Sequence, residues 1–277
     1  MTQPAHSSNS MSGQPLSGPG SIRAVLLAAG VGDRLRPFTD HHPKCLVEVG
    51  QRTLLAHHLD LLSQIPEISG LVIVVGYLED QIRAAVAAWK QQTGSAFDVR
   101  FEVNPEFRKG SILSLHTAKT HLVESDTVIM DADVLYPREL MERLVRAAHA
   151  NCFLIDETTV PTGEEMMVCV TGERALHIAR SREPSTQSGW DFAGEGVGFF
   201  RLDKHDSVRL VEIMDAMVAD GIDRVEYEAA LDRFMKEKVA GYVPCGDFPW
   251  TEIDFAEDVD KAVNEVFPAI LAAGLTL

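Results

Sequence analysis

LLAAGVGDRLRPFT (residues 26–39), followed closely by HPKCLVEVG (42–50), is the part of this sequence with the clearest structural signal. The apolar run at 22–28 leads into it and predicts a strand buried on both faces of a parallel sheet. Small residues come next, as expected where a backbone loop approaches phosphate groups closely; they are Ala28, Ala29, Gly30 and Gly32. The sequence therefore predicts a phosphate-binding loop directly after the first strand.

Three basic residues after this loop strengthen the prediction. Arg34, Arg36 and Lys44 place cations within reach of the same phosphates. The dinucleotide fingerprint GxGxxG does not fit, because Leu35 occupies its third glycine position, and the GK[ST] of a Walker loop is absent. A glycine turn that only packs is the remaining alternative.

The first half of the chain alternates between strand-like and helix-like segments. This alternation predicts βαβ units and an open sheet. Strands are expected at 22–28, 71–77, 97–104 and 126–134, and helices at 53–64, 78–92, 111–123 and 137–149. The fold class is therefore α/β, with a Rossmann-like, mixed but mostly parallel sheet flanked by helices.

The pattern changes at about residue 151. Short strand-like pieces at 167–171, 174–181 and 196–202 predict antiparallel additions to the sheet, and a further strand-like run lies at 239–243. Helices are expected at 204–219, at 226–236 and at the C-terminal end. With no internal repeat and no linker after residue 20, residues 21–277 are expected to form a single domain.

Composition limits the classes of partner. The net charge of −16 argues against nucleic acids and anionic membranes. No apolar run approaches the ~20 residues needed to span a bilayer, and residues 1–20, rich in Ser, Gly and Pro, read as a disordered segment rather than a signal peptide. The four cysteines are far apart and suggest neither a zinc site nor disulfides. A soluble, cytoplasmic protein is expected.

Two pairs of acids stand at strand-like segments far apart in the sequence. Asp131 and Asp133 are two residues apart, so both side chains project from one face beyond the strand's carboxyl end. Glu252 and Asp254 repeat this spacing. Ligands of open α/β sheets bind at that edge, and Mg²⁺ prefers carboxylate oxygens together with substrate phosphates. The sequence predicts a Mg²⁺ site here, although a solvated strand end is the alternative for any single acid.

AAGxGxRLxPxT followed by PKxLVEV resembles the signature of nucleotidyltransferases that activate sugar phosphates, phosphocholine, inositol phosphate and small phosphonates. The resemblance extends to about residue 262. It implies a fold of the nucleotide-diphospho-sugar transferase type, in which residues 21–150 bind an NTP and residues 151–277 bind the acceptor. It also implies nucleotide contacts from the loop residues Leu27, Ala28, Ala29, Gly30 and Gly32.

The resemblance assigns roles to the charged residues as well. Arg34 and Lys44 fall on the catalytic cations that contact the phosphates, and Asp133 and Asp254 fall on the metal ligands. Asp131 and Glu252 would support these ligands. The acceptor oxygen would attack the α-phosphorus in line and pyrophosphate would leave. A dianionic nucleophile needs no general base, so no catalytic histidine is expected.

VNPEFRKGSILSLHTA (103–118) resembles the NPxFxxxNxxSL segment of phosphocholine and related cytidylyltransferases. This likeness implies that the segment and the Gly76–Tyr77 turn surround the base, with CTP as the expected nucleotide. Ser111 stands where that pattern usually has Asn. Ser111 and Ser114 can hydrogen-bond a pyrimidine edge; the alternative for Ser111 is a helix N-cap.

Aromatic and acidic residues of the second half suggest an acceptor with an ammonium group. The candidates for this wall are Trp190, Glu195, Tyr227 and Trp250, with Arg180 for the acceptor's phosphate. Phosphocholine or an aminoalkylphosphonate fits this description. The bland alternative is that the aromatic residues fill the core and that Arg180 lies on a solvated strand edge.

Two other functions remain open. A sugar-1-phosphate or inositol-1-phosphate nucleotidyltransferase would use the same chemistry, although REPSTQSGWDF (182–192) only loosely resembles the sugar-binding segment of those enzymes. A non-catalytic member of the fold would tend to lose the loop cations or the metal acids, and all of these are present. The apolar tail at 266–277 suits a homodimer interface.

Overall fold

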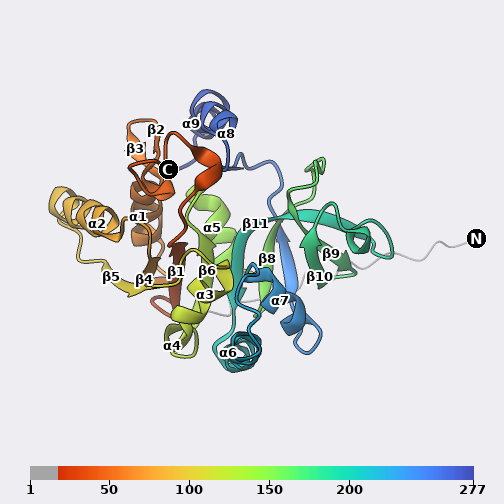
Figure 1. Ribbon diagram of the computed structural model, residues 1–277. Coiled ribbons are helices and arrows are strands. Elements are labelled where there is room, and N and C mark those ends of the chain that lie inside the picture. Colours follow the sequence, from red (N-terminus) through yellow and green to blue (C-terminus); the bar gives the residue numbers. More distant parts are fainter. Residues whose placement is uncertain (1–17) are drawn as a thin grey trace, which may run out of the picture.

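The computed structural model describes residues 18–277. Most of the segment expected to be disordered, residues 1–20, therefore lies outside the described residues. Within the described part, a nine-stranded sheet runs through the molecule with helices on both faces (Figure 1). The predicted mixed, mostly parallel α/β architecture is confirmed.

The parallel half of the sheet is built around β1 (Ile22–Ala28). It lies between β4 (Ile68–Val75) and β6 (Asp126–Asp131), and β5 (Asp98–Val103) follows β4 at the edge; all these pairs are parallel. The register of β1 places Leu27 opposite Asp131. The carboxyl ends of these strands therefore meet at one edge, where the glycine loop leaves β1.

Helices cover both faces of this sheet because alternate residues of each strand point in opposite directions. Ala24 and Leu26 of β1 pack in the core under α1 (Leu54–Gln64), α2 (Glu79–Thr93) and α5 (Arg138–Val145). Val25 packs in the other core, under helices of the second face. These are α3 (Ser111–Thr117), α4 (Lys119–Leu122), α6 (Lys204–Ala219) and α7 (Glu228–Met235). The helix expected at 111–123 is thus divided at Ala118.

The antiparallel half begins at β11 (Phe192–Leu202), which pairs with β6 from Phe199 to Leu202. Its first part pairs with β9 (Met166–Thr171), which in turn pairs with β10 (Arg174–Arg180). The predicted antiparallel additions are confirmed. One strand, β8 (Cys152–Asp156), was not expected; it pairs with β11 and with β12 (Gly241–Pro244). Its short apolar run follows a helix with little turn signal, which is why the pattern missed it.

The C-terminal segment brings two acids back to the end of β6. β13 (Thr251–Glu252) pairs with β7 (Val134–Leu135), and α8 (Ala256–Lys261), a π-helical turn (Ala262–Val266) and α9 (Phe267–Ala272) follow. This end packs on a third apolar cluster, together with residues from the segment that contains two 3₁₀ turns (Asp33–Leu35, Lys44–Leu46) and the hairpin of β2 (Glu48–Val49) and β3 (Arg52–Thr53).

Val266 and Ile270 of the apolar tail are buried against their own chain, while Leu271 is exposed. The homodimer stays a prediction. Among the described residues, no helix has the length and apolar character required to cross a bilayer.

Candidate active site

The loop after β1 has the backbone geometry that its glycines suggested. Gly32 has a φ of +69°, and a Cβ there would lie 3.1 Å from Thr39 Cγ2 and 3.3 Å from Lys44 Cβ. The Thr39 hydroxyl donates to the Gly32 carbonyl at 2.7 Å and fixes the turn. The backbone from Leu27 to Gly32 lines a cavity of about 510 Å³.

Lys44 lies between two of the predicted metal acids. Its Nζ is 2.6 Å from Asp133 Oδ2 and also donates to Asp254 Oδ1. Burial alone would lower the pKa of Lys44, but the carboxylates of Asp133, Asp254 and Glu252 raise it above its usual value. The ammonium therefore stays charged at this end of the cavity.

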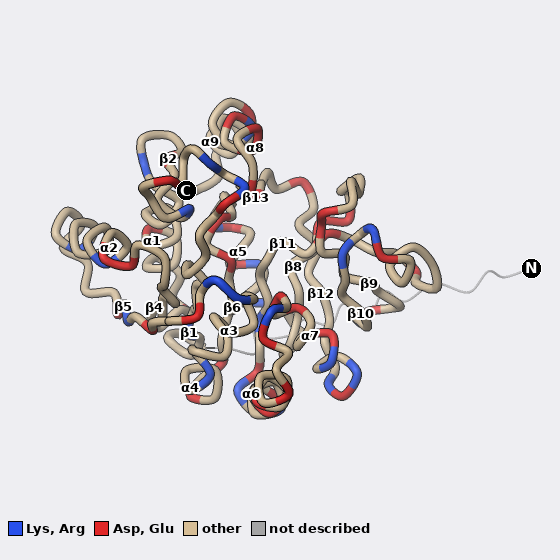
Figure 2. Tube along the Cα trace, in the orientation of Figure 1, with Lys and Arg blue, Asp and Glu red and all other residues tan. Residues whose placement is uncertain are grey.

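Arg34 approaches the same carboxylates from the glycine loop. Its Nη2 donates to Asp254 Oδ2 at 2.5 Å, and its guanidinium carbon lies 5.1 Å from the centre of the Phe255 ring. Nη1 is 3.8 Å from Glu164 Oε2, on the segment before β9. Figure 2 shows basic residues of the first part of the chain beside the acidic stretch at β13. Both cations thus meet Asp254, which is 220 residues from Arg34 and 210 residues from Lys44 in the sequence.

Three carboxylates have the arrangement of a cation site. Ligand oxygens of Asp133, Glu252 and Asp254 all lie within 4.8 Å of one another. Asp133 Oδ1 is buried and has no hydrogen-bond partner among the described residues. An all-oxygen donor set with an unused, buried carboxylate oxygen fits Mg²⁺. Glu252, expected to support the ligands, is thus a member of this group, and Asp131 is not.

Burial and the concentration of acids in this region raise the pKa values of Asp131 and Glu252. Burial, followed by the charges of Asp133 and Glu228, raises the pKa of Asp131 well above its usual value, and the hydrogen bond from Tyr227 opposes this. Burial and the charges of Asp133 and Asp254 likewise raise the pKa of Glu252, and Lys44 lowers it. Additional positive charge in this region would stabilise the ionised carboxylates.

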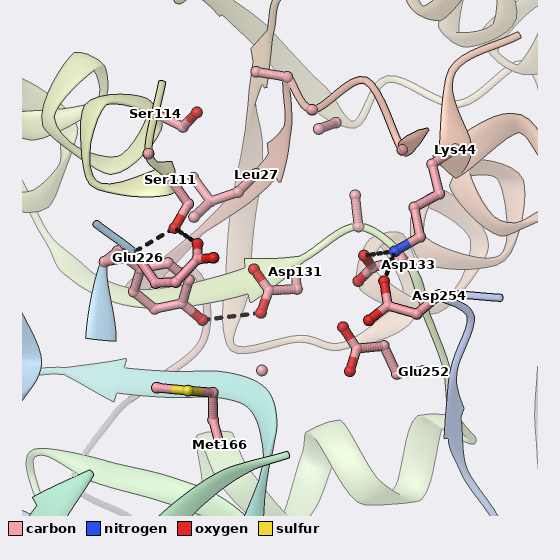
Figure 3. A pocket seen from close by; sticks show the side chains of 18 of the residues that line it. Leu27, Lys44, Ser111, Ser114, Asp131, Asp133, Met166, Glu226, Glu252 and Asp254 are labelled. Carbon is pink, nitrogen blue, oxygen red and sulfur yellow. Dashed lines mark hydrogen bonds and ion pairs between the residues drawn. The ribbon is translucent and has the colours of Figure 1, made fainter. Parts of the chain in front are cut away.

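Ser111 and Ser114 lie at the opposite end of the cavity from Lys44 and the three acids, near Leu27 (Figure 3). Ser114 Oγ accepts from Asn104 Nδ2 at 3.0 Å. Ser111 Oγ donates to Glu226 Oε2 at 2.8 Å and accepts from the Tyr227 backbone N–H at 2.9 Å. Ser111 starts α3, but no side-chain N-cap bond is formed at that helix, so the N-cap alternative is wrong.

The segment before α7 is locked to the start of α3. The Gly110 N–H donates to the Asp223 carbonyl at 3.0 Å, and Ile112 N–H donates to the Val225 carbonyl at 3.2 Å. A Cβ on Gly110 would lie 2.1 Å from the Val225 carbonyl oxygen, so only glycine fits. Segments more than 100 residues apart in the sequence therefore form one continuous wall of the cavity.

Gly76 and Tyr77 are not among the residues that line the cavity. The Phe107 side chain occupies the space where a Cβ of Gly76 would lie, with its own Cβ at 2.6 Å and the ring carbon Cγ at 2.8 Å. The Tyr77 hydroxyl lies 3.2 Å from the carbonyl oxygens of Thr39 and Asp40, and its N–H donates to the Ala29 carbonyl. Both residues support the loop and the Phe107 wall from behind.

Of the predicted acceptor residues, Arg180, Glu195 and Tyr227 line the cavity. The Tyr227 hydroxyl donates to Asp131 Oδ2 at 3.0 Å, and Glu195 accepts from the Thr159 hydroxyl at 2.7 Å. Burial and the charges of Glu165 and Asp156 raise the pKa of Glu195. Arg180 lies 3.5 Å from Glu226 Oε1.

The two tryptophans expected in the same wall lie elsewhere. Trp190 stacks on His177 with ring centres 6.0 Å apart, and its Nε1 donates to the Ser185 carbonyl. Trp250 packs against the core, and its Nε1 donates to Asp156 Oδ2 at 2.8 Å. Neither lines the cavity, because each N–H is satisfied by a group of its own neighbourhood. The alternative that the aromatic residues fill the core is right for Trp250, whereas Trp190 belongs to none of the hydrophobic clusters of the described residues.

Several lining residues carried no recognisable signal in the sequence. They are Arg108, Lys109, Glu164, Glu165, Met166 and Glu226. Most of them lie in segments flanking strands or helices whose path a local pattern does not determine. His57 and His58 are buried in α1 outside the cavity, and burial lowers the pKa of His58 to about 3.

Residues 24–193 match the family described as the MobA-like NTP transferase domain. A choline-phosphate cytidylyltransferase of Streptococcus pneumoniae is 30% identical over 139 residues, which cover 50% of this chain and 56% of that relative. A UTP–glucose-1-phosphate uridylyltransferase of Haloferax volcanii is 29% identical over 177 residues, covering 59% of this chain and 67% of that relative. The chain spans between a fifth and just over half of the length of four curated relatives that it matches.

A solved structure of CTP:phosphocholine cytidylyltransferase from Streptococcus pneumoniae has the same fold. It superposes with a TM-score of 0.66 at 23% identity and covers 87% of this chain and 97% of that one. The resemblance seen in the glycine loop is confirmed by both kinds of comparison. This match covers more than half of the chain, and the chain therefore belongs to the MobA-like NTP transferase domain family.

Proposed function

We propose that this protein is a Mg²⁺-dependent nucleotidyltransferase. It transfers CMP from CTP to a small phosphate or phosphonate acceptor, such as phosphocholine or an aminoalkylphosphonate, and releases pyrophosphate. The observation that carries the proposal is the convergence of Arg34, Lys44 and three carboxylates beside a glycine loop. Such a group suits a triphosphate with a divalent cation.

In this proposal the chain contributes positioning and charge. The backbone from Ala28 to Gly32 cradles the phosphates, and Lys44 and Arg34 neutralise the charge that develops as the P–O bond to pyrophosphate breaks. An acceptor oxygen forms the new bond to the α-phosphorus, and the electron pair of the broken bond leaves with pyrophosphate. Asp133, Glu252 and Asp254 would hold the Mg²⁺, which supplies further charge neutralisation.

No side chain has to remove a proton from the acceptor, because a phosphate or phosphonate dianion is already the nucleophile. This agrees with the surroundings of the reacting end, where Lys44 and Arg34 are hydrogen-bonded to carboxylates. Among the residues that line the cavity there is no histidine in the described part of the chain. Catalysis by orientation and charge is therefore sufficient.

The choice of CTP is supported by the likeness of 103–118 to cytidylyltransferases and by the matched choline-phosphate cytidylyltransferase. A second candidate is transfer of UMP to a sugar 1-phosphate. It is favoured by one specific observation, the similarity to the Haloferax volcanii uridylyltransferase over 177 residues. Both candidates use the same residues at the phosphate end and differ in base and acceptor.

The experiment is pyrophosphate release in Mg²⁺, with each of the four NTPs crossed with phosphocholine, 2-aminoethylphosphonate, inositol 1-phosphate and glucose 1-phosphate. We expect the fastest release with CTP and an amine-bearing acceptor. Release with UTP and glucose 1-phosphate alone would favour the second candidate. If no NTP gave pyrophosphate with any of these acceptors, the proposed cytidylyl and uridylyl transfers would both be wrong.

A further inference from the structure

The cavity contains an excess of acid that a phosphate-binding enzyme does not obviously need. Ten carboxylate side chains line it, against five from lysine and arginine. A triphosphate and an acceptor phosphate add further negative charge, and one Mg²⁺ offsets only part of the total. The excess points to another positive group in the bound state.

The carboxylates that lack a partner for their charge are identified by setting aside those that already have one. Five of the ten are ion-paired with Lys or Arg; these are Asp33, Asp133, Glu164, Glu226 and Asp254. Glu252 belongs to the cation site. Glu165 is satisfied by hydrogen bonds from Thr162 and Ser181, which outweigh burial and lower its pKa to about 2. Asp131, Glu195 and Glu228 remain, without an ion pair to any described residue.

Glu228 is the most informative of the three. Its Oε2 is inaccessible to solvent and has no hydrogen-bond partner among the described residues, and its side chain lines the cavity at the start of α7. An unpaired buried carboxylate oxygen is costly unless something supplies a donor. Asp131 and Glu195, in contrast, each have one neutral hydroxyl as partner, from Tyr227 and Thr159.

This end offers little exposed aromatic surface for a trimethylammonium group. Only Phe107 and Tyr227 contribute aromatic rings to the lining of the cavity among the described residues. Tyr227 is 4% exposed, and Trp190 and Trp250 are held outside. A trimethylammonium group has no N–H and is bound chiefly by aromatic faces. A primary ammonium has three N–H donors and needs oxygen acceptors.

Resting on the proposed function, we infer that the acceptor carries a primary ammonium group, bound by the unpaired carboxylates of Glu228, Glu195 and Asp131. Arg180, which lines the cavity 3.5 Å from Glu226 Oε1, offers a cation for the acceptor's phosphate or phosphonate. Met166, which faces the cavity near Asp131 (Figure 3), supplies apolar contact for a short methylene chain. The preferred acceptor is a small zwitterion, an aminoalkyl phosphate or phosphonate, rather than a choline ester.

The test compares phosphoethanolamine with phosphocholine, which differ only in three N-methyl groups, and with ethyl phosphate, which lacks the amine. We expect kcat/KM for phosphoethanolamine to exceed that for each of the others by about tenfold or more. Glu228→Gln should lower kcat/KM for phosphoethanolamine by about ten- to hundredfold and leave ethyl phosphate within about twofold. Glu183→Gln, an exposed acid outside the cavity, is the matched control and should change neither.

Equal or better use of phosphocholine would overturn the inference. So would a Glu228→Gln variant, folded by its unchanged melting temperature, that loses activity equally with and without the amine. If the wild type released no pyrophosphate with any NTP, the proposed function would fail. Calorimetric binding of phosphoethanolamine and phosphocholine would then still decide this inference, since it requires tighter binding of the primary amine.

Discussion

The two ends of the cavity differ in how their charges are balanced. At the phosphate end, Lys44 and Arg34 already contact Asp133 and Asp254. At the acceptor end, Glu195 and Glu228 line the wall without an ion pair to any described cation. In the first arrangement the chain itself supplies cations to two of the acids, whereas in the second we infer that a ligand supplies the positive charge.

This difference separates two ways of building a binding site. Opposite charges in contact hold one another in place before the substrate arrives, so little reorganisation is needed during the reaction. Unpaired buried acids have raised pKa values, about 7 for Glu228, where burial and the charge of Glu226 outweigh Arg180. Such acids lower the stability of the folded chain, and a cationic ligand that pairs with them gains binding affinity. Four predictions test this contrast, in decreasing order of expected effect.

Removing a carboxylate from the phosphate end should have the largest effect. Asp133→Ala and Asp254→Ala are each expected to reduce kcat by about a thousandfold or more, because each removes a ligand of the proposed Mg²⁺ site and a partner of Lys44. Chelation of divalent ions should do the same to the wild type. Pyrophosphate release measures all three, and Asp260→Ala on the exposed side of α8 is the control. Wild-type rates in either variant would exclude these acids as metal ligands.

Replacing the cation should have the next largest effect. Lys44→Met keeps most of the length of the side chain but removes its charge, and should lower kcat by about 10²- to 10³-fold. Lys44→Arg should recover little, since a planar guanidinium does not fit between Asp133 and Asp254 as an ammonium does. Single-turnover kinetics would separate this loss from weaker binding. A variant with more than half of the wild-type kcat would contradict the role of Lys44 in the reaction.

The link between β11 and Asp131 should appear as a loss of stability. Gly198 has a φ of +78°, and a Cβ there would lie 2.5 Å from Asp131 Oδ2. Gly198→Ala should therefore cost about 1–3 kcal/mol of unfolding free energy, measured in urea. Gly221, with a φ of +76° and open space around it, is the matched control. Equal costs for both alanine variants would mean that Asp131 does not depend on this contact.

The smallest effect should come from the tryptophan that lies outside the cavity. Trp190→Phe is expected to change the acceptor KM by less than about twofold, because the ring stacks on His177. Tyr227→Phe removes the hydroxyl that donates to Asp131 and should raise the same KM several-fold. Acceptor titrations at saturating nucleotide measure both. A larger effect on the acceptor KM at Trp190 than at Tyr227 would support the prediction that Trp190 belongs to the acceptor site.

The phosphate end was predictable because each of its residues belongs to a local pattern. The end of a buried strand predicts that Asp131 and Asp133 lie at the ligand-binding edge of the sheet, and the glycine loop predicts that Arg34 lies there too. That Glu252 joins Asp133 and Asp254, while Asp131 turns to Tyr227, was not predictable. The positive φ at Gly198 and the pairing of β13 with β7 determine which acids come together, and both depend on contacts between distant segments.

The acceptor end could be predicted only in part. Glu195 alternates along β11 and Tyr227 precedes α7, but a tryptophan in a sequence carries no sign of whether its ring faces a ligand or its own chain. Trp190 contacts Ser185 and His177, and Trp250 donates to Asp156. No local sequence pattern indicates these contacts. Arg108 and Lys109, near the start of α3, were likewise outside any periodic pattern.

The tight fit of Gly110 against Val225 has a consequence for the order of events. Ser111 holds the Tyr227 N–H and the Glu226 carboxylate, so the two walls of the cavity cannot shift independently. A nucleotide that orders the start of α3 should also order the start of α7, where Glu228 lies, the carboxylate proposed to bind the acceptor's ammonium group. Each substrate should then increase the affinity for the other by the same factor, as thermodynamic reciprocity requires.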